Sequence, residues 1–301
     1  MKSLFKNIFL IVLLTLLASF FKKQEALSFL SSFDLWYEPV LASMICGTLC
    51  SLAGLYLVMN QMTLTGLALT QTSGLGIFVA FFLLSFIPLS ESLYHTLPLM
   101  MGVFFGVGTI LLFVNKKKLQ ELLTAMLYVG GASLILILGD RVAEGHHEIE
   151  SFLFGNAVAI AHHDFFILLS VSAVLFLVFI LRHKHFVAVS LDGDDYQVSG
   201  YARGQQTTLL YLVIAMAITI SMKTMGQLPV LGFLVFPVAT AMQQSRSFRE
   251  TFIQALLFGC MTGPVGYYFS YIYSFPTGAS IVATGLLFYG SALVQYRNLN
   301  K

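Results

Sequence analysis

Two polar segments of this sequence concentrate side chains that suit a metal ion. The stretches AEGHHEIE (143–150) and AHHD (161–164) together contain four of the seven histidines and several carboxylates. Neutral imidazole and carboxylate are ligands for zinc, manganese and iron. The candidate ligands are His146, His147, Glu148, Glu150, His162, His163 and Asp164. A solvated loop between two helices has the same composition, so a metal-collecting site and an ordinary polar loop both stay open.

Other motifs with chemical potential are absent or incomplete. An HExxH zinc protease motif that starts at His147 requires a histidine at position 151, where the sequence has Ser151. Cys46 and Cys50 are spaced i, i+4, but no histidine or carboxylate accompanies them, so buried packing is favoured over a soft-metal site. The sequence contains no GxxxxGK(S/T) phosphate loop, so ATP would have to bind another subunit. We therefore predict no enzymatic activity and no cofactor held by this chain.

The elements that position these residues are expected to lie in a membrane. Of 301 residues, 57% are hydrophobic and only 10% are charged, and the mean hydropathy is +0.85. A water-soluble core cannot hide that much apolar surface, so lipid must be the solvent. The net charge of +2 gives no indication of a nucleic-acid partner. The predicted fold class is an all-α integral membrane protein, a polytopic helical bundle of about eight to ten transmembrane helices.

Apolar runs long enough to cross a bilayer recur along the whole chain. Short polar breaks separate them, and they fall at residues 5–21, 39–59, 66–88, 98–114, 121–139, 166–182, 208–223, 226–243, 252–273 and 277–296. Several runs are near the lower limit for a span at a rise of about 1.5 Å per residue, so that one or two can be re-entrant or merged. The runs contain no conspicuous chain of ionisable side chains, which disfavours a carrier driven by an ion gradient.

Lysine and arginine predict the orientation, because these residues resist transfer across the membrane. With the N-terminus inside, twelve of the sixteen lie on the cytoplasmic side: Lys2, Lys6, Lys116, Lys117, Lys118, Arg182, Lys184, Arg203, Arg246, Arg249, Arg297 and Lys301. The outer side keeps Lys22, Lys23, Arg141 and Lys223, so both termini are expected to be cytoplasmic. The first run has the basic start of a signal peptide but no convincing cleavage motif. Residues 1–38 are therefore expected to form an uncleaved, signal-anchor-like helix and an outer linker.

The cytoplasmic loop SLDGDDYQVSGYARG (190–204) carries a pattern typical of a short helix. The carboxylates Asp192, Asp194 and Asp195 favour a helix N-terminus, and Gly200 suits its end. A short helix in such a loop is suited to docking on a partner, although an ordinary solvated turn would have the same sequence.

Proline and glycine interrupt the later apolar runs. Pro237, Pro264 and Pro276 each remove a backbone hydrogen bond, and nearby glycines permit close helix approach. Such residues suit helices around a moving pathway but are also common in membrane helices. The candidate hinge is formed by Gly226, Gly232 and Pro237.

From about residue 39 to residue 296, the chain resembles the permease subunits of ABC importers for zinc, manganese and iron. The stretches that carry the resemblance are EPVLASMICGTLCSLAGLYLVMNQMTLTG, SLDGDDYQVSGY, MGQLPVLGFLVFPVATAM and FPTGASIVATGLLF, in the family's order and spacing. The resemblance implies a type II importer with two permeases, two ATPases and an extracytoplasmic substrate-binding protein in a bacterial plasma membrane. It also implies that the loop with Asp192 and Gly200 is the coupling element that contacts the ATPase.

The sequence departs from the family at one important position. The family carries an aspartate and, four residues later, a histidine at the start of its second core helix, as presumed metal ligands in the pathway. The matching run here is GLALTQTSGLG, with Leu67 and Gln71 in those places. Leucine cannot bind a metal and an amide is a poor zinc ligand, so the family's pathway site is predicted to be lost.

These observations predict a permease for residues 39–301, in an ATP-driven importer of a divalent metal ion such as zinc, manganese or iron. One alternative is a permease-like subunit for a non-metal solute, or half of a heterodimeric permease whose partner keeps the aspartate and histidine. Another is an ion-gradient carrier or a membrane scaffold. The expected partners are an ATPase dimer that binds ATP, a second permease copy or paralogue, a substrate-binding protein and membrane lipid.

Overall fold

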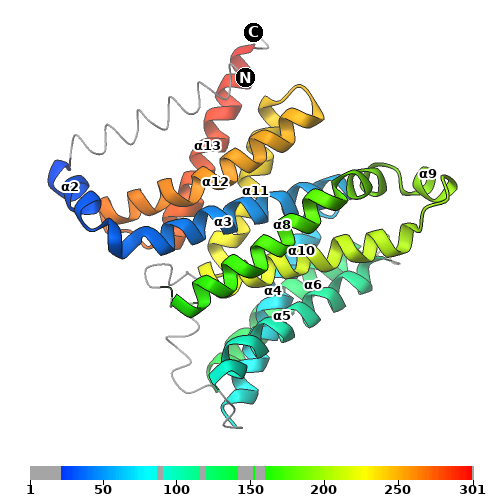
Figure 1. Ribbon diagram of the computed structural model, residues 1–301, viewed down its shortest axis with the longest axis horizontal. Coiled ribbons are helices and arrows are strands. Elements are labelled where there is room, and N and C mark those ends of the chain that lie inside the picture. Colours follow the sequence, from blue (N-terminus) through cyan, green and yellow to red (C-terminus); the bar gives the residue numbers. More distant parts are fainter. Residues whose placement is uncertain are drawn as a thin grey trace.

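The computed structural model describes residues 22–86, 91–114, 120–141, 152, 160 and 162–299. Within these ranges the regular elements are all helices: α2 (Lys23–Ser31), α3 (Phe33–Met59), α4 (Thr63–Leu84), α5 (Glu91–Val114), α6 (Gln120–Gly139), α8 (His162–Leu191), α9 (Gly193–Val198), α10 (Arg203–Met225), α11 (Gln227–Gln244), α12 (Phe248–Tyr273) and α13 (Thr277–Leu299). Figure 1 shows a bundle of long tilted helices. Its two ends are named here after α2 and α9, which lie at opposite ends.

The predicted apolar runs agree well with the helices. Nine of the ten runs coincide with a described helix, and the run at 5–21 lies outside the described residues. Among the described helices, six have the length and composition to cross a membrane: Trp36–Met59, Thr63–Leu84, Glu121–Gly139, His162–Leu191, Arg203–Met225 and Thr277–Gln295. The all-α polytopic fold is therefore confirmed, whereas eight to ten spans stays a prediction.

The helix with the second predicted run begins earlier than residue 39. α3 starts at Phe33 and contains Pro39. Trp36 and Tyr37 lie in the additional turns, and such amphipathic rings favour the boundary between lipid and water, so the helix continues beyond its apolar run. The predicted division of the chain after residue 38 therefore falls inside a helix.

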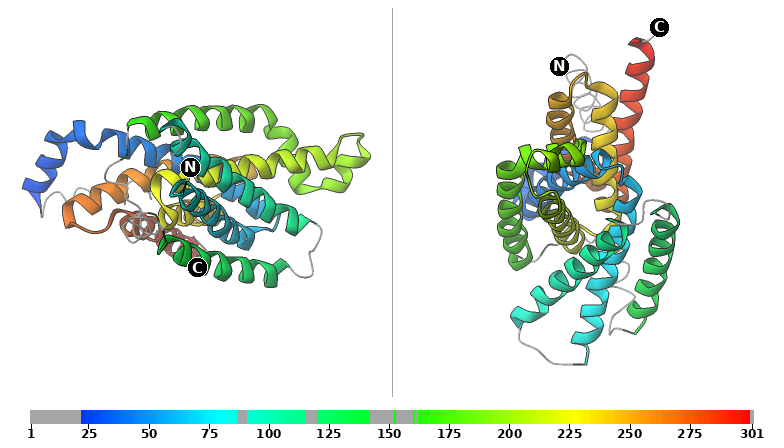
Figure 2. Two further views of the ribbon diagram at one scale, coloured as in Figure 1. Left: turned by 90° about the horizontal axis from the view of Figure 1, so that it is seen from below. Right: turned by 90° about the vertical axis from the view of Figure 1, so that its right-hand side faces the viewer.

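α3 is the central helix of the bundle. It packs against α11 and α12 on one side and against α8 and α10 on the other. α4 lies between α5 and α6, while α13 packs on α11 and α12. In Figures 1 and 2 the cyan and green helices α4–α6 and the yellow to red helices α11–α13 flank the group of α3, α8 and α10.

Glycine allows α3 to touch its neighbours backbone to backbone. A Cβ atom added at Gly47 would overlap the Gly259 carbonyl of α12, and one added at Gly259 would overlap the Gly47 carbonyl. Gly54 is placed in the same way against the Leu234 carbonyl of α11. Lipid provides no hydrophobic force between helices, so close packing at small residues is a main source of their association.

We expect Gly259→Leu to abolish the folded protein, whereas Gly108→Leu is tolerated. At Gly259 the obstacle is backbone, which cannot move aside as a flexible side chain does, so overpacking costs about 3 kcal/mol or more. At Gly108 of α5, an added Cβ meets no described atom within 4 Å. Size-exclusion chromatography of the detergent-solubilised variants measures the folded fraction. Equal folded fractions for the two variants would contradict this account of the α3–α12 contact.

Candidate functional site

The first turn of α8 is tied to two other helices at the α2 end. His162 Nδ1 lies 2.6 Å from Glu38 Oε1 of α3, and the Tyr37 hydroxyl donates a hydrogen bond of 2.9 Å to the same oxygen. Asp164 Oδ1 forms an ion pair of 2.8 Å with Lys223 Nζ at the end of α10. The Lys223 side chain is only 11% exposed, so this ion pair is largely withdrawn from water.

Two of the predicted metal ligands at this end contact other side chains. His162 contacts Glu38, Asp164 contacts Lys223, and the exposed His163 lies between them in sequence. Among the described residues, no group of three or more histidine, cysteine, aspartate or glutamate side chains is arranged to hold a metal ion. The other candidates, His146, His147, Glu148 and Glu150, lie outside the described residues. The metal-collecting site therefore stays a prediction.

Glu38 was not among the residues selected from the sequence. It is only 8% exposed, and its partner His162 is 124 positions away in the chain. The sequence feature that could have indicated Glu38 is a carboxylate next to the aromatic pair Trp36 and Tyr37 at the start of an apolar run. The cysteines Cys46 and Cys50 are fully buried and unbridged in α3, which agrees with the packing interpretation.

The predicted short helix of the loop is confirmed as α9 at the opposite end of the bundle. The Asp192 side chain caps it by accepting hydrogen bonds of 3.1 Å from the backbone N–H groups of Asp194 and Asp195. Gly200 follows with φ +85, a left-handed conformation that glycine adopts without strain. Asp194 also forms an ion pair with Arg203 at the start of α10, which closes the loop.

A cluster of rings connects α9 to the end of α8. The His185 Nδ1 atom and the Tyr196 hydroxyl share a hydrogen bond of 2.8 Å, and Tyr196 stacks on Tyr201 with ring centroids 4.9 Å apart. Tyr196 is buried although α9 as a whole is exposed, so the short helix is anchored by its one aromatic residue.

The same end of α8 is also fixed to α3. The His183 Nδ1 atom and the Tyr56 hydroxyl share a hydrogen bond of 2.9 Å, and the Tyr56 ring stacks on Phe179. Directly after the end of α3, the Asn60 amide donates a hydrogen bond of 2.9 Å to the Ser190 hydroxyl. Sequence reasoning missed these residues, since no local pattern relates α3 to α8.

The two positions that depart from the family pattern lie at different contacts of α4. Leu67 is half-buried and borders a small pocket shared with Gly54 of α3 and Leu234 of α11. Gln71 is 4% exposed, and its Oε1 atom is buried with no hydrogen-bond partner among the described residues. A Cβ atom added at Gly131 of α6 would lie 2.9 Å from the Gln71 Cβ, so this amide sits where α4 meets α6.

The three candidate hinge residues occupy one continuous stretch of chain. Gly226, with φ +85, is the single residue between α10 and α11. A Cβ atom added at Gly232 would lie 3.0 Å from Val282 Cγ2 of α13, so α11 and α13 approach closely there. Pro237 is buried inside α11.

Comparison with known proteins decides the family. Residues 32–295 match the model of the ABC 3 transport family, which covers all described helices from α3 to α12 and most of α13. The chain belongs to the ABC 3 transport family. It is thus a membrane-spanning permease subunit of an ABC transporter, and the sequence resemblance is confirmed.

Individual members of the family and one solved structure agree over most of the chain. A "Probable iron transport system membrane protein" of Haemophilus influenzae is 24% identical over 261 residues, 87% of this chain and 93% of the relative. The "Chelated iron transport system membrane protein YfeD" of Yersinia pestis is 26% identical over 257 residues, 85% of this chain and 84% of the relative. The solved structure "PsaBC from Streptococcus pneumoniae in complex with Fab" superimposes with a TM-score of 0.73 at 20% identity, covering 89% of this permease and 94% of that chain.

The Asp164–Lys223 pair gives a prediction for the permease. Lys223→Met removes the ammonium group beside a carboxylate that is 28% exposed, so we expect a loss of stability of about 1–3 kcal/mol. The double variant Asp164→Asn, Lys223→Met should regain most of that loss, because neither charge then remains. Lys23→Met, at an exposed position of α2, is the matched control. Thermal unfolding in detergent measures the four proteins, and equal melting temperatures for Lys223→Met and Lys23→Met would contradict the prediction.

Proposed function

We propose that this permease subunit belongs to an ATP-driven importer of a divalent metal ion such as zinc, manganese or iron. The observation that carries the proposal is the match of residues 32–295 to the ABC 3 transport family. Two relatives that cover most of the chain are described as iron and chelated-iron transport system membrane proteins, which supports a metal substrate.

The proposed assembly contains two permeases, two ATPase subunits that bind ATP, and an extracytoplasmic substrate-binding protein. The second permease is another copy of this chain or a paralogue. We place the assembly in a bacterial plasma membrane, with the α9 end and both termini of the chain in the cytoplasm. The basic residues Arg182, Lys184 and Arg203 at the α9 end support this orientation. Residues 39–301 then form the transport body, and residues 1–38 the anchor and outer linker.

The loop that contains Asp192, Asp194, Asp195 and Gly200 is the proposed contact with the ATPase. Its buried Tyr196 is bonded to His185 of α8, and α8 is bonded in turn to α3 through His183 and Tyr56. A movement of α9 would therefore reach the centre of the bundle through hydrogen-bonded rings.

The proposed hinge converts this movement into alternating access. The loop also leads directly into α10, whose other end joins α11 at Gly226. Gly232 and Pro237 lie further along the same stretch, where bending meets less backbone resistance. Closure of the ATPase dimer would favour one arrangement of α10 and α11 over the other.

Two residues of α4 bear on the identity of the substrate. Leu67 and Gln71 stand where the family carries an aspartate and a histidine, and the Gln71 carbonyl oxygen is a neutral acceptor with no partner in the described part of the chain. This departure favours a second candidate, in which the chain passes a non-metal or metal-linked solute, or pairs with a paralogue that keeps both ligands.

Elemental analysis of cells lacking the gene tests the proposed function. We expect one metal among zinc, manganese and iron to fall and to return to normal when the wild-type gene is restored. A variant with His146, His147, His162 and His163 changed to alanine tests the metal-collecting site, and restoration by this variant would exclude that site. Unchanged amounts of all metals in the deletion strain would overturn a metal substrate and favour the second candidate.

The coupling loop gives a separate prediction. Gly200→Val forces a β-branched residue into the left-handed region at a cost of about 1–2 kcal/mol, which should distort the loop after α9. ATP hydrolysis should then continue while uptake is lost and expression is unchanged. Gly204→Val is the control, because Gly204 lies in α10 with nothing within 4 Å of an added Cβ. Normal coupling in Gly200→Val would remove the coupling role from this loop.

A further inference from the structure

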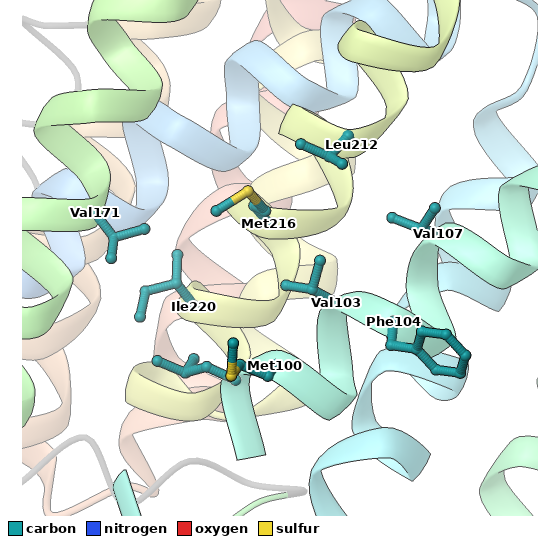
Figure 3. Close-up of a pocket in the computed structure, with 9 residues that line it drawn as sticks. Met100, Val103, Phe104, Val107, Val171, Leu212, Met216 and Ile220 are labelled. Carbon is teal, nitrogen blue, oxygen red and sulfur yellow. The ribbon is translucent and has the colours of Figure 1, made fainter. Parts of the chain in front are cut away.

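A large apolar cavity lies between α5, α8 and α10. Its volume is about 460 Å³, within the range of small-molecule sites. Every described residue that lines it is apolar: Leu99, Met100, Val103, Phe104 and Val107 from α5, Val171 from α8, and Leu212, Met216 and Ile220 from α10. In Figure 3, α10 forms the floor, with Val171 on one side and Val107 and Phe104 on the other.

This cavity is an open groove, and its shape follows from how the three helices pack. α5 and α8 each pack on α10 but make little contact with each other, so a groove remains above α10. The groove is open to the outside, since Met100 is 69% exposed and Phe104 is 72% exposed. It is therefore continuous with the apolar surface that these membrane helices present to lipid.

The Asp164–Lys223 ion pair is a reference point from which the depth of the groove in the bilayer can be estimated. It joins the first turn of α8, where His162 and His163 are exposed, to the last turn of α10, which ends at Met225. The pair therefore marks the level at which both helices end on the α2 side. Ile220, Met216 and Leu212 follow along α10 at about 5, 10 and 16 Å below Lys223, from a rise of about 1.5 Å per residue. Half of a hydrocarbon core is about 15 Å thick, so the groove spans one leaflet.

We propose that this groove is a specific binding site for one acyl chain of a phospholipid from the leaflet at the α2 end. A void in the hydrocarbon region has no partner atoms for its lining, and the lining offers no polar group to hold water. An acyl chain supplies those contacts and matches both the depth and the purely apolar lining. Because three helices surround it, the bound acyl chain exchanges more slowly than lipid on the open faces of α6 or α8. The acyl chain also separates α5 from α8 along α10.

Photolabelling tests the site in the full-length chain, purified with the subunits that accompany it and reconstituted in nanodiscs. The probe is phosphatidylglycerol with a photoactivatable group in the middle of one acyl chain. We expect mass spectrometry to find the label concentrated on α5 and α10 peptides. We also expect phospholipid to remain bound there after exchange into detergent. Even labelling of α5, α6 and α8 would overturn the proposal, since it indicates only annular lipid.

Two variants with the same substitution separate filling of the groove from a general effect of bulk. Val103→Phe places a ring in the groove and should lower the labelling of α5 and α10 several-fold. Val129→Phe, on the open face of α6 where Val129 is 63% exposed, should leave it unchanged. Val107→Phe replaces Val103→Phe if the latter does not fold. Unchanged labelling in the groove variant would overturn the proposal.

A photo-crosslinking amino acid at Phe104 distinguishes the occupants directly. Adducts with phospholipid support the proposal. Adducts with another polypeptide, including a second copy of this chain, would overturn it and identify the groove as a protein interface.

Discussion

The close approach of α3 to α11 and α12 is the contact on which the rest of the fold depends. Gly47, Gly54 and Gly259 bring backbone against backbone, and lipid adds no hydrophobic force that would replace this packing if it were lost. α3 also contacts α8 and α10 on its other side, so its position fixes both helices that lead into and out of α9. Small residues where α3 meets α11 and α12 thus determine where α9 and the α2 end are placed.

The two ends of α8 are held by different chemistry. At the α2 end, the contact of His162 with Glu38 joins it to α3, and the ion pair of Asp164 with Lys223 joins it to α10. At the α9 end, stacked rings and the hydrogen bonds of His183 and His185 join it to α3 and α9. Both ends of α8 are therefore fixed to α3. Under the proposed function, a force that an ATPase exerts on α9 would reach the bundle through these contacts.

Much of the architecture was predictable because a bilayer imposes strong local rules. Each span must be an apolar helix of about 20 residues, so the apolar runs predict helices nearly one for one. Local capping rules likewise predicted α9, whose Asp192 cap and Gly200 exit lie within nine residues of each other. The start of α3 was missed because its first turns are amphipathic and lie outside the apolar run.

The contacts between helices were not predictable from one sequence. Glu38 and His162, like Tyr56 and His183, come together only through tertiary packing, and no periodicity relates such distant positions. Of the histidines that suggested metal chemistry, His162 takes part in such a contact, whereas His146 and His147 lie outside the described residues, so the metal-collecting site stays a prediction. The departure at Leu67 and Gln71, by contrast, needed only the order of residues in one helix. In the proposed assembly, the meaning of this departure for the substrate depends on the second permease.

Uptake by the reconstituted transporter tests the central claim most directly. The permease and its ATPase would be reconstituted in liposomes with the α9 end and ATP on the inside. The substrate-binding protein would be added outside, and zinc, manganese and iron inside the liposomes would be measured over time. The account predicts accumulation of one of these metals that requires both ATP and the binding protein. Continued ATP hydrolysis without accumulation of any metal would contradict it.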